Sequence, residues 1–202
     1  MKVLLINGSP HKEGCTYTAL NEVAGQLAKE KIETEIFHIG NKPVHGCIDC
    51  RRCFSLEKCV FDDDAANSIL AKMKTADGIV VGSPVYYAAP NGALCALLDR
   101  VFYAGGKFIA GKPAAAVVSC RRGGASAAFD RLNKYFTINQ MPVVTSQYWN
   151  SVHGFTPADV KKDLEGLQTM RVLGHNMAWL LRSTANSFSA LQEERIMTNF
   201  VR

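Results

Sequence analysis

Four cysteines gathered in one short segment are the residues whose types and spacing most clearly suggest chemistry. Cys47, Cys50 and Cys53 are three residues apart, and Cys59 follows at short range. Four thiolates are the ligand number of a [4Fe–4S] cluster, so the motif predicts a cluster. Structural zinc more often takes two C-x-x-C pairs from separated segments and is less favoured here. Four reduced thiols that shape a pocket without metal are the third interpretation, and the motif leaves all three open.

A second candidate site is the loop over residues 7–16, which follows the first apolar run. Its glycines let the backbone approach a ligand, and the free N–H groups at the start of the next helix favour an anion. These properties suit a phosphate group. The dinucleotide fingerprint G-x-G-x-x-G is absent. A plain strand-to-helix turn is the alternative interpretation.

Two further loops carry side chains that suit a planar or anionic ligand. Pro84-Val85-Tyr86-Tyr87 follows another apolar run, and its adjacent tyrosines can lie against a planar ring. Arg121-Arg122-Gly123-Gly124 offers two guanidinium groups beside backbone donors. The alternatives are tyrosines that pack on neighbouring helices and a basic loop that is simply solvated.

The elements that must position these loops alternate along the chain. Strands are predicted at Lys2–Asn7, Glu33–Ile39, Asp77–Ser83, Pro113–Cys120 and Val143–Trp149. Helices are predicted by apolar stripes over Leu20–Ala28, Ala66–Met73, Leu94–Phe102, Ala125–Phe136 and Ala158–Leu181. Near-continuous apolar strands between amphipathic helices indicate an α/β fold with a doubly wound, five-stranded parallel sheet. Such sheets bind ligands beyond the carboxyl ends of their strands, which is where these loops lie.

The composition fits a soluble globular protein, with 48% apolar and 20% charged residues among 202. The apolar runs are far shorter than the roughly 20 residues of a membrane span, and the first run is too short for a secretory signal. We therefore expect a cytoplasmic protein with reduced cysteines and no membrane partner. The net charge of +5 suits anionic small ligands, and we expect no nucleic-acid partner.

One domain is predicted over residues 1–182, with the cysteine-rich loop 45–61 inserted after the second strand. The tail 183–202 carries more apolar residues than a solvated terminus usually does: Phe188, Leu191, Ile196, Met197, Phe200 and Val201. We expect this tail to dock on its own or a partner subunit, and the protein to be a dimer or larger homo-oligomer.

The three loops, in this order, resemble those of flavodoxin-fold NAD(P)H-dependent FMN reductases. The cysteine motif is similar to that of the branch called iron–sulfur flavoproteins. This resemblance runs from Lys2 to about Asn150 and implies the strand order 2-1-3-4-5 and non-covalently bound FMN. It implies phosphate contacts from Ser9, His11, Gly14, Cys15, Thr16 and Tyr17, isoalloxazine contacts from Pro84, Val85, Tyr86 and Tyr87, and pyrimidine-side contacts from Arg121, Arg122, Gly123 and Gly124. Cys15 stands where Asn is more frequent, so the resemblance implies a backbone donor to the phosphate at this position.

The resemblance also implies an oxidoreductase. Its FMN would accept hydride from NADH or NADPH and pass electrons to a quinone, a free flavin, an iron–sulfur centre or a redox protein. No side chain is predicted as a catalytic acid or base, because the chemistry takes place at the flavin. A non-enzymatic electron carrier like flavodoxin is the alternative. The basic charge balance disfavours a carrier, since flavodoxins are strongly acidic.

Overall fold

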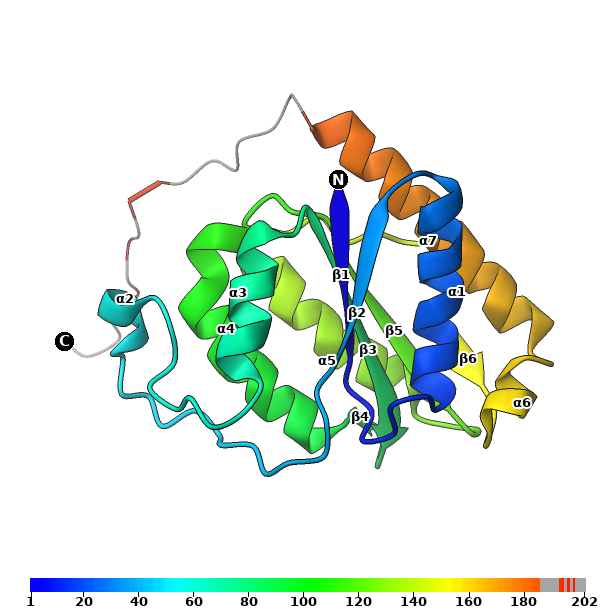
Figure 1. Cartoon of the computed structure of the whole chain (residues 1–202), viewed down its shortest axis with the longest axis horizontal. Helices are drawn as coiled ribbons and strands as arrows, with labels where there is room; N and C mark the ends of the chain where they lie inside the picture. The colour runs from blue at the N-terminus through cyan, green and yellow to red at the C-terminus, as the bar shows by residue number, and fades with distance from the viewer. Residues whose placement is uncertain (186–192, 195, 197, 199–202) are drawn as a thin grey trace.

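A central sheet separates two groups of helices in the computed structural model of the protein (Figure 1). The structure describes residues 1–185, 193, 194, 196 and 198. Its elements follow in the order β1 (Lys2–Asn7), α1 (Cys15–Lys29), β2 (Glu33–His38), α2 (Cys53–Leu56), α3 (Ala66–Thr75), β3 (Gly78–Tyr86), β4 (Ala89–Pro90), α4 (Gly92–Ile109), β5 (Ala114–Cys120), α5 (Ala125–Ile138), β6 (Ser151–His153), α6 (Pro157–Val160) and α7 (Leu164–Thr184).

Five parallel strands form the sheet in the order β2-β1-β3-β5-β6. The two-residue β4, which the sequence did not predict, pairs antiparallel with the end of β3. Apart from β4, this order is the predicted 2-1-3-4-5. Asn7 of β1 lies beside His38 of β2 and Gly82 of β3. The loop after β1 and the outer part of β3 are therefore brought to one edge of the sheet.

Strand β1 illustrates why the inner strands carry apolar residues on both faces. Leu4 and Ile6 belong to the core that lies under α3, α4 and α5. Val3 and Leu5 alternate with them and belong to the core under α1 and α7. All four are fully buried. A strand covered by helices on both faces needs no polar side, which is the pattern that predicted the doubly wound sheet.

The fifth parallel strand was predicted at Val143–Trp149, and this prediction is wrong. Only Val143 bridges to Ala114 of β5, and the strand proper, β6, begins at Ser151 opposite Val118. β5 advances four residues between these two points, whereas the edge segment advances eight. The side chain of Asn150 replaces a main-chain bond, because its Nδ2 donates to the Ala116 carbonyl at 3.0 Å. The extra residues therefore loop away from the edge of the sheet.

The last predicted helix, Ala158–Leu181, is divided into α6 and α7. Thr156 and Asp159 form a capping box that starts α6. Asp163 Oδ1 accepts a hydrogen bond from the Gly166 N–H at 2.9 Å and starts α7 separately. Aspartate favours such caps over helix interiors because its short side chain competes for backbone N–H groups.

The tail beyond α7 lies almost wholly outside the described residues. Of its six apolar side chains only Ile196 is described, and it is exposed. The docking of the tail and the homo-oligomer stay predictions. Among the described helices, none combines the length and the apolar character that crossing a membrane requires.

Candidate functional site

The loop between β1 and α1 is held by buried polar side chains. Asn7 is fully buried, its Oδ1 accepts from the Ser9 N–H at 3.1 Å, and its Nδ2 donates to the Lys12 carbonyl at 3.1 Å. Ser9 is also buried, and its Oγ accepts from the N–H of His11 at 3.1 Å. These bonds fix the course of the loop before it enters the helix.

Helix α1 begins directly behind this loop and has a free N-terminal turn. Its N-cap is Gly14, which has no side chain to accept from the first N–H groups. A pocket adjoins this helix end, lined by residues 10–15 together with Phe155 and Pro157. Unpaired N–H groups and the positive end of the helix dipole together attract an anion.

The side chains of Thr16 and Cys15 have partners inside the protein. Thr16 is 1% exposed, and its Oγ1 lies 2.8 Å from Ser119 Oγ at the end of β5. The Cys15 thiol donates to the Gly154 carbonyl at 3.8 Å, and burial raises its pKa. Cys15 is therefore held as a protonated thiol, which does not suit a reactive nucleophile. His11 is exposed at the pocket, and Tyr17 is half-buried.

The hairpin of β3 and β4 presents two exposed tyrosines beyond the sheet. Tyr86 is 44% exposed and Tyr87 is fully exposed. The turn residues Tyr87 and Ala88 both have a left-handed backbone, with φ of 50° and 57°. This conformation normally takes Asn-Gly, and side chains there store strain of roughly 1 kcal/mol or more per residue. Pro84 and Val85, before the turn, are half-buried.

The loop after β5 packs against this hairpin through Gly124. The φ of Gly124 is +87°, and a Cβ there would lie 2.8 Å from the Ala88 Cα. Only glycine fits both the conformation and the contact. Arg121, Arg122 and Gly123 precede it and are exposed.

Sequence reasoning missed the polar side chains that join these loops. Asn91 Nδ2 donates to the Gly8 carbonyl at 2.8 Å, and the Asn91 N–H donates to Ser83 Oγ at 2.9 Å. His38 Nε2 lies 2.9 Å from the Ser9 carbonyl. Each is a polar residue at the end of an apolar strand or the start of a helix, and that position was the available signal. The predicted residues of the three loops therefore lie along one sheet edge.

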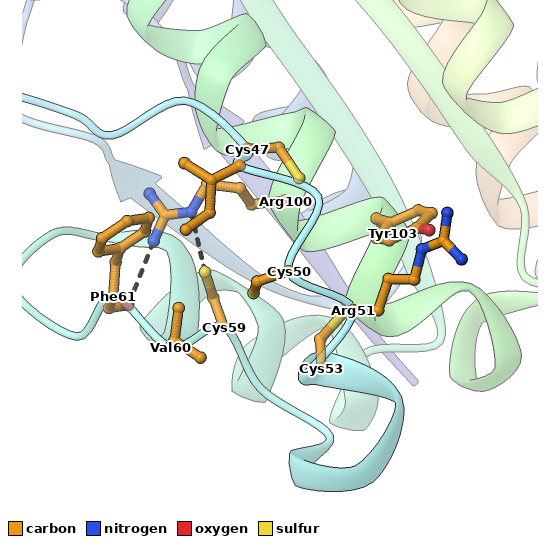
Figure 2. A pocket seen from close by; sticks show the side chains of 10 residues that line it. Cys47, Cys50, Arg51, Cys53, Cys59, Val60, Phe61, Arg100 and Tyr103 are labelled. Carbon is orange, nitrogen blue, oxygen red and sulfur yellow. Dashed lines mark hydrogen bonds between the residues drawn. The ribbon is translucent and has the colours of Figure 1, made fainter.

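The four cysteines line a single pocket elsewhere on the molecule, between the segment after β2 and helix α4 (Figure 2). Cys47 and Cys50 are exposed, Cys53 and Cys59 are half-buried, and all four are free thiols. Burial raises the pKa of Cys53, and charge on the other three cysteines raises it further, because the four lie close together. Within the described residues, no three His, Cys, Asp or Glu side chains are arranged to hold a metal ion.

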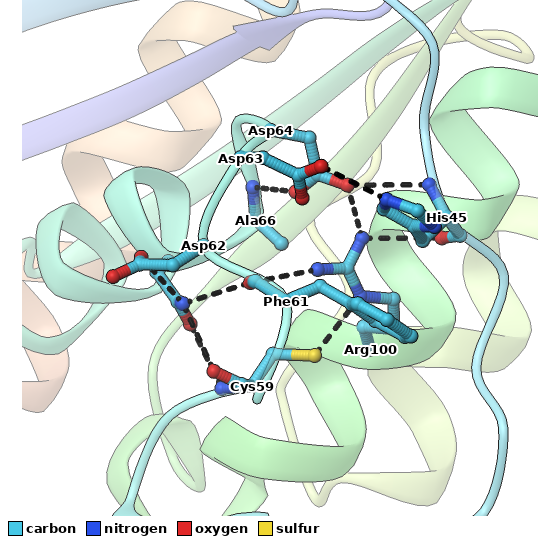
Figure 3. Close-up of polar contacts among 9 residues, drawn as sticks. His45, Cys59, Phe61, Asp62, Asp63, Asp64, Ala66 and Arg100 are labelled. Carbon is cyan, nitrogen blue, oxygen red and sulfur yellow. Dashed lines mark hydrogen bonds and ion pairs between the residues drawn. The ribbon is translucent and has the colours of Figure 1, made fainter.

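A buried ion pair that the sequence analysis did not predict supports this pocket (Figure 3). The side chains of Arg100 on α4 and Asp64 are 1% and 2% exposed and form a salt bridge. Arg100 also donates to the His45 carbonyl at 3.1 Å, to the Phe61 carbonyl at 3.2 Å, and through Nε to Cys59 Sγ at 3.1 Å. The only signal was a charged residue within the apolar pattern of a helix.

Comparison with known proteins identifies the family of the chain. The family model for NADPH-dependent FMN reductases matches residues 1–156, which include the three loops and the four cysteines. An iron–sulfur flavoprotein of Methanocaldococcus jannaschii is 36% identical over 192 residues, covering 90% of this chain and 98% of the relative.

Solved structures with low sequence identity share the fold. The crystal structure of RosB with a bound formylriboflavin phosphate intermediate has a TM-score of 0.73 at 15% identity, covering 100% of this chain and 93% of RosB. A flavodoxin from the domain Archaea has a TM-score of 0.61 at 16% identity, covering 90% of this chain and 99% of the flavodoxin. These likenesses establish a flavodoxin-like fold, and the sequence matches show that the chain belongs to the NADPH-dependent FMN reductase family, in its iron–sulfur flavoprotein branch.

Proposed function

We propose that this protein is an FMN-dependent oxidoreductase that takes hydride from NADH or NADPH and delivers the electrons to a second acceptor. One observation carries the proposal. In a member of the FMN reductase family, a free helix N-terminus, a hairpin with two exposed tyrosines and an Arg-Gly loop lie along one sheet edge. Bound FMN supplies the redox chemistry, because its ring accepts a hydride and returns the electrons singly or in pairs.

The loop after β1 suits the phosphate of FMN. The N–H groups of the first turn of α1 have no cap from Gly14 and can donate to phosphate oxygens. Ser9 and His11 can add side-chain donors, since both lie in the loop that precedes the helix. Thr16 contributes its backbone N–H, while its hydroxyl keeps the bond to Ser119. Gly14, Cys15 and Tyr17 complete the proposed phosphate contacts.

The other two loops suit the flavin ring. The hairpin that contains Pro84–Tyr87 exposes two tyrosines, whose flat rings can lie against a planar ligand. Arg121, Arg122 and the backbone of Gly123 and Gly124 are proposed to bind the pyrimidine side. The guanidinium groups would stabilise negative charge that builds up there. No side chain is assigned as an acid or base.

The cysteine pocket suits a [4Fe–4S] cluster better than zinc. Structural zinc more often takes its sulfur ligands as two pairs from separated segments, whereas all four cysteines here stand in one short segment. A cluster needs a separate thiolate for each of its irons, and four free thiols around one pocket match that number. We propose that Cys47, Cys50, Cys53 and Cys59 hold this cluster and that it accepts electrons one at a time. The similarity to an iron–sulfur flavoprotein supports the assignment.

The test is an anaerobic preparation with quantification of flavin, iron and sulfide. We expect FMN and about four irons and four sulfides per chain, together with steady oxidation of NADH or NADPH when an acceptor is present. Cys50→Ser should remove the iron and spare FMN, whereas Cys95→Ser, on α4 outside the pocket, should spare both. Absence of FMN would overturn the oxidoreductase. FMN that dithionite reduces but neither nicotinamide reduces would instead indicate an electron carrier.

A further inference from the structure

We propose that Arg100 is a positioning residue of the cysteine site, which fixes the sulfur of Cys59 and raises the reduction potential of the cluster. This inference rests on the [4Fe–4S] assignment proposed above. Arg100 belongs to none of the three loops at the sheet edge and is not a metal ligand, so the proposed function gives it no role.

The guanidinium of Arg100 is held in one orientation. Its Nη groups bind Asp64 and the carbonyls of His45 and Phe61, which come from both ends of the cysteine segment. The Phe61 ring lies 5.4 Å from the guanidinium, and the His45 ring stacks on Phe61 at 4.2 Å. The guanidinium is thus enclosed by the segment that it binds.

A further donor, Nε, faces sulfur. It lies 3.1 Å from Cys59 Sγ, as the dashed line in Figure 2 marks. Because the Nη groups are already engaged, the side chain cannot turn Nε away without breaking other buried bonds. The geometry therefore assigns to Arg100 a fixed N–H···S hydrogen bond to one of the four candidate ligands.

Such a bond affects redox chemistry in a predictable direction. Reduction of the cluster adds one electron, and hydrogen bonds to its sulfurs stabilise the added negative charge. Arginine stays protonated throughout, so the electron arrives without a proton transfer from Arg100. Lysine could still pair with Asp64, but it lacks a donor equivalent to Nε. The difference between arginine and lysine isolates the sulfur bond from the buried charge.

The experiment compares wild type, Arg100→Lys and Arg52→Lys by anaerobic redox titration of the cluster, followed by EPR. Arg52 is an exposed arginine in the same segment that does not line the pocket. We expect Arg100→Lys to bind full iron and FMN, with a lower cluster midpoint potential and an unchanged flavin potential. Arg52→Lys should match wild type. An unchanged cluster potential in Arg100→Lys, or an equal shift in Arg52→Lys, would overturn the role of Arg100.

A second measurement leaves Arg100 unchanged. Arg51→Lys removes the other arginine that lines the pocket, and this variant, with its remaining arginines labelled with ¹⁵N in the guanidinium, should show a nitrogen coupling in pulsed EPR of the reduced cluster. A reduced cluster without that coupling overturns the inference. If Arg100→Lys loses its iron, this measurement is the deciding one. A wild-type preparation that takes up no iron contradicts the cluster itself, and with it the role given to Arg100. A cluster without the coupling contradicts only Arg100.

Discussion

Replacing Gly124 by alanine tests whether the loop after β5 and the hairpin of β3 and β4 act as one unit. The new methyl group would meet a left-handed backbone at φ +87° and would lie 2.8 Å from the Ala88 Cα. The neighbouring atom belongs to the backbone, so no side-chain rotation can relieve the contact. Either the strain is retained or the hairpin moves.

The expected loss of stability follows from the left-handed backbone and the close contact. An alanine in the left-handed region costs about 1–2 kcal/mol. Overpacking a closely packed contact costs about 1–3 kcal/mol more. At about 2–4 °C per kcal/mol for a chain of this size, the melting temperature should fall by about 4–20 °C. If the hairpin moves instead, less stability is lost, but the FMN dissociation constant should rise about tenfold for each 1.4 kcal/mol of lost contact.

Thermal unfolding followed by circular dichroism measures the loss of stability, and FMN titration by fluorescence quenching measures the change in affinity. Gly123→Ala is the control for stability, because nothing lies within 4 Å of its added Cβ. If Gly124→Ala is as stable as Gly123→Ala and also binds FMN as tightly as wild type, the two loops are not coupled as argued.

Three further substitutions test buried or half-buried polar contacts. Asp64→Asn leaves a buried guanidinium without its counter-ion and should cost about 3–5 kcal/mol at pH 7. Burial opposes ionisation of Asp64, but its hydrogen bonds, first that from the guanidinium, give it a lowered pKa. Wild type therefore loses this stabilisation as the pH falls below about 4. There the free energies of unfolding in urea of wild type and Asp64→Asn should converge. Asp130→Asn, at an exposed position, should follow wild type at every pH. Ser119→Ala leaves buried Thr16 without its partner and should cost about 1–3 kcal/mol, and the double variant with Thr16→Val should lose less than the two single losses combined. Lys112→Met removes donors to three carbonyls around the end of α3; it should cost about 1.5–3 kcal/mol and speed hydrogen exchange there.

The sheet could be predicted from the sequence because its inner strands are apolar on both faces. β1 buries Leu4 and Ile6 on one side and Val3 and Leu5 on the other, so a continuous apolar run identifies it. The edge strand lacks this property. Val143–Trp149 is rich in β-branched and aromatic residues, yet Trp149 is 58% exposed and the pairing resumes only at Ser151. Propensity cannot show that Asn150 replaces part of the ladder with its side chain.

The residues at the sheet edge could be predicted for a related reason. A parallel sheet brings the carboxyl ends of its strands to one edge, so a loop that follows a strand is predicted to lie at that edge. The bonds that join these loops to other elements were not predictable, because each connects residues far apart in sequence. Asn91 meets Gly8, Ser119 meets Thr16, and His38 meets Ser9 only after the sheet has formed.

The cysteine pocket is built differently, and this has a consequence for how the two sites respond to mutation. No strand end positions the cysteines. Their segment is attached to α4 by a buried guanidinium that binds both the start and the end of it. None of the ten residues lining the pocket belongs to the three loops at the sheet edge. Substitutions in the Arg100 network should therefore change the cysteine site and leave the sheet-edge loops intact, whereas changes at Gly124 should do the reverse. The fold therefore supports two candidate sites that different contacts hold in place.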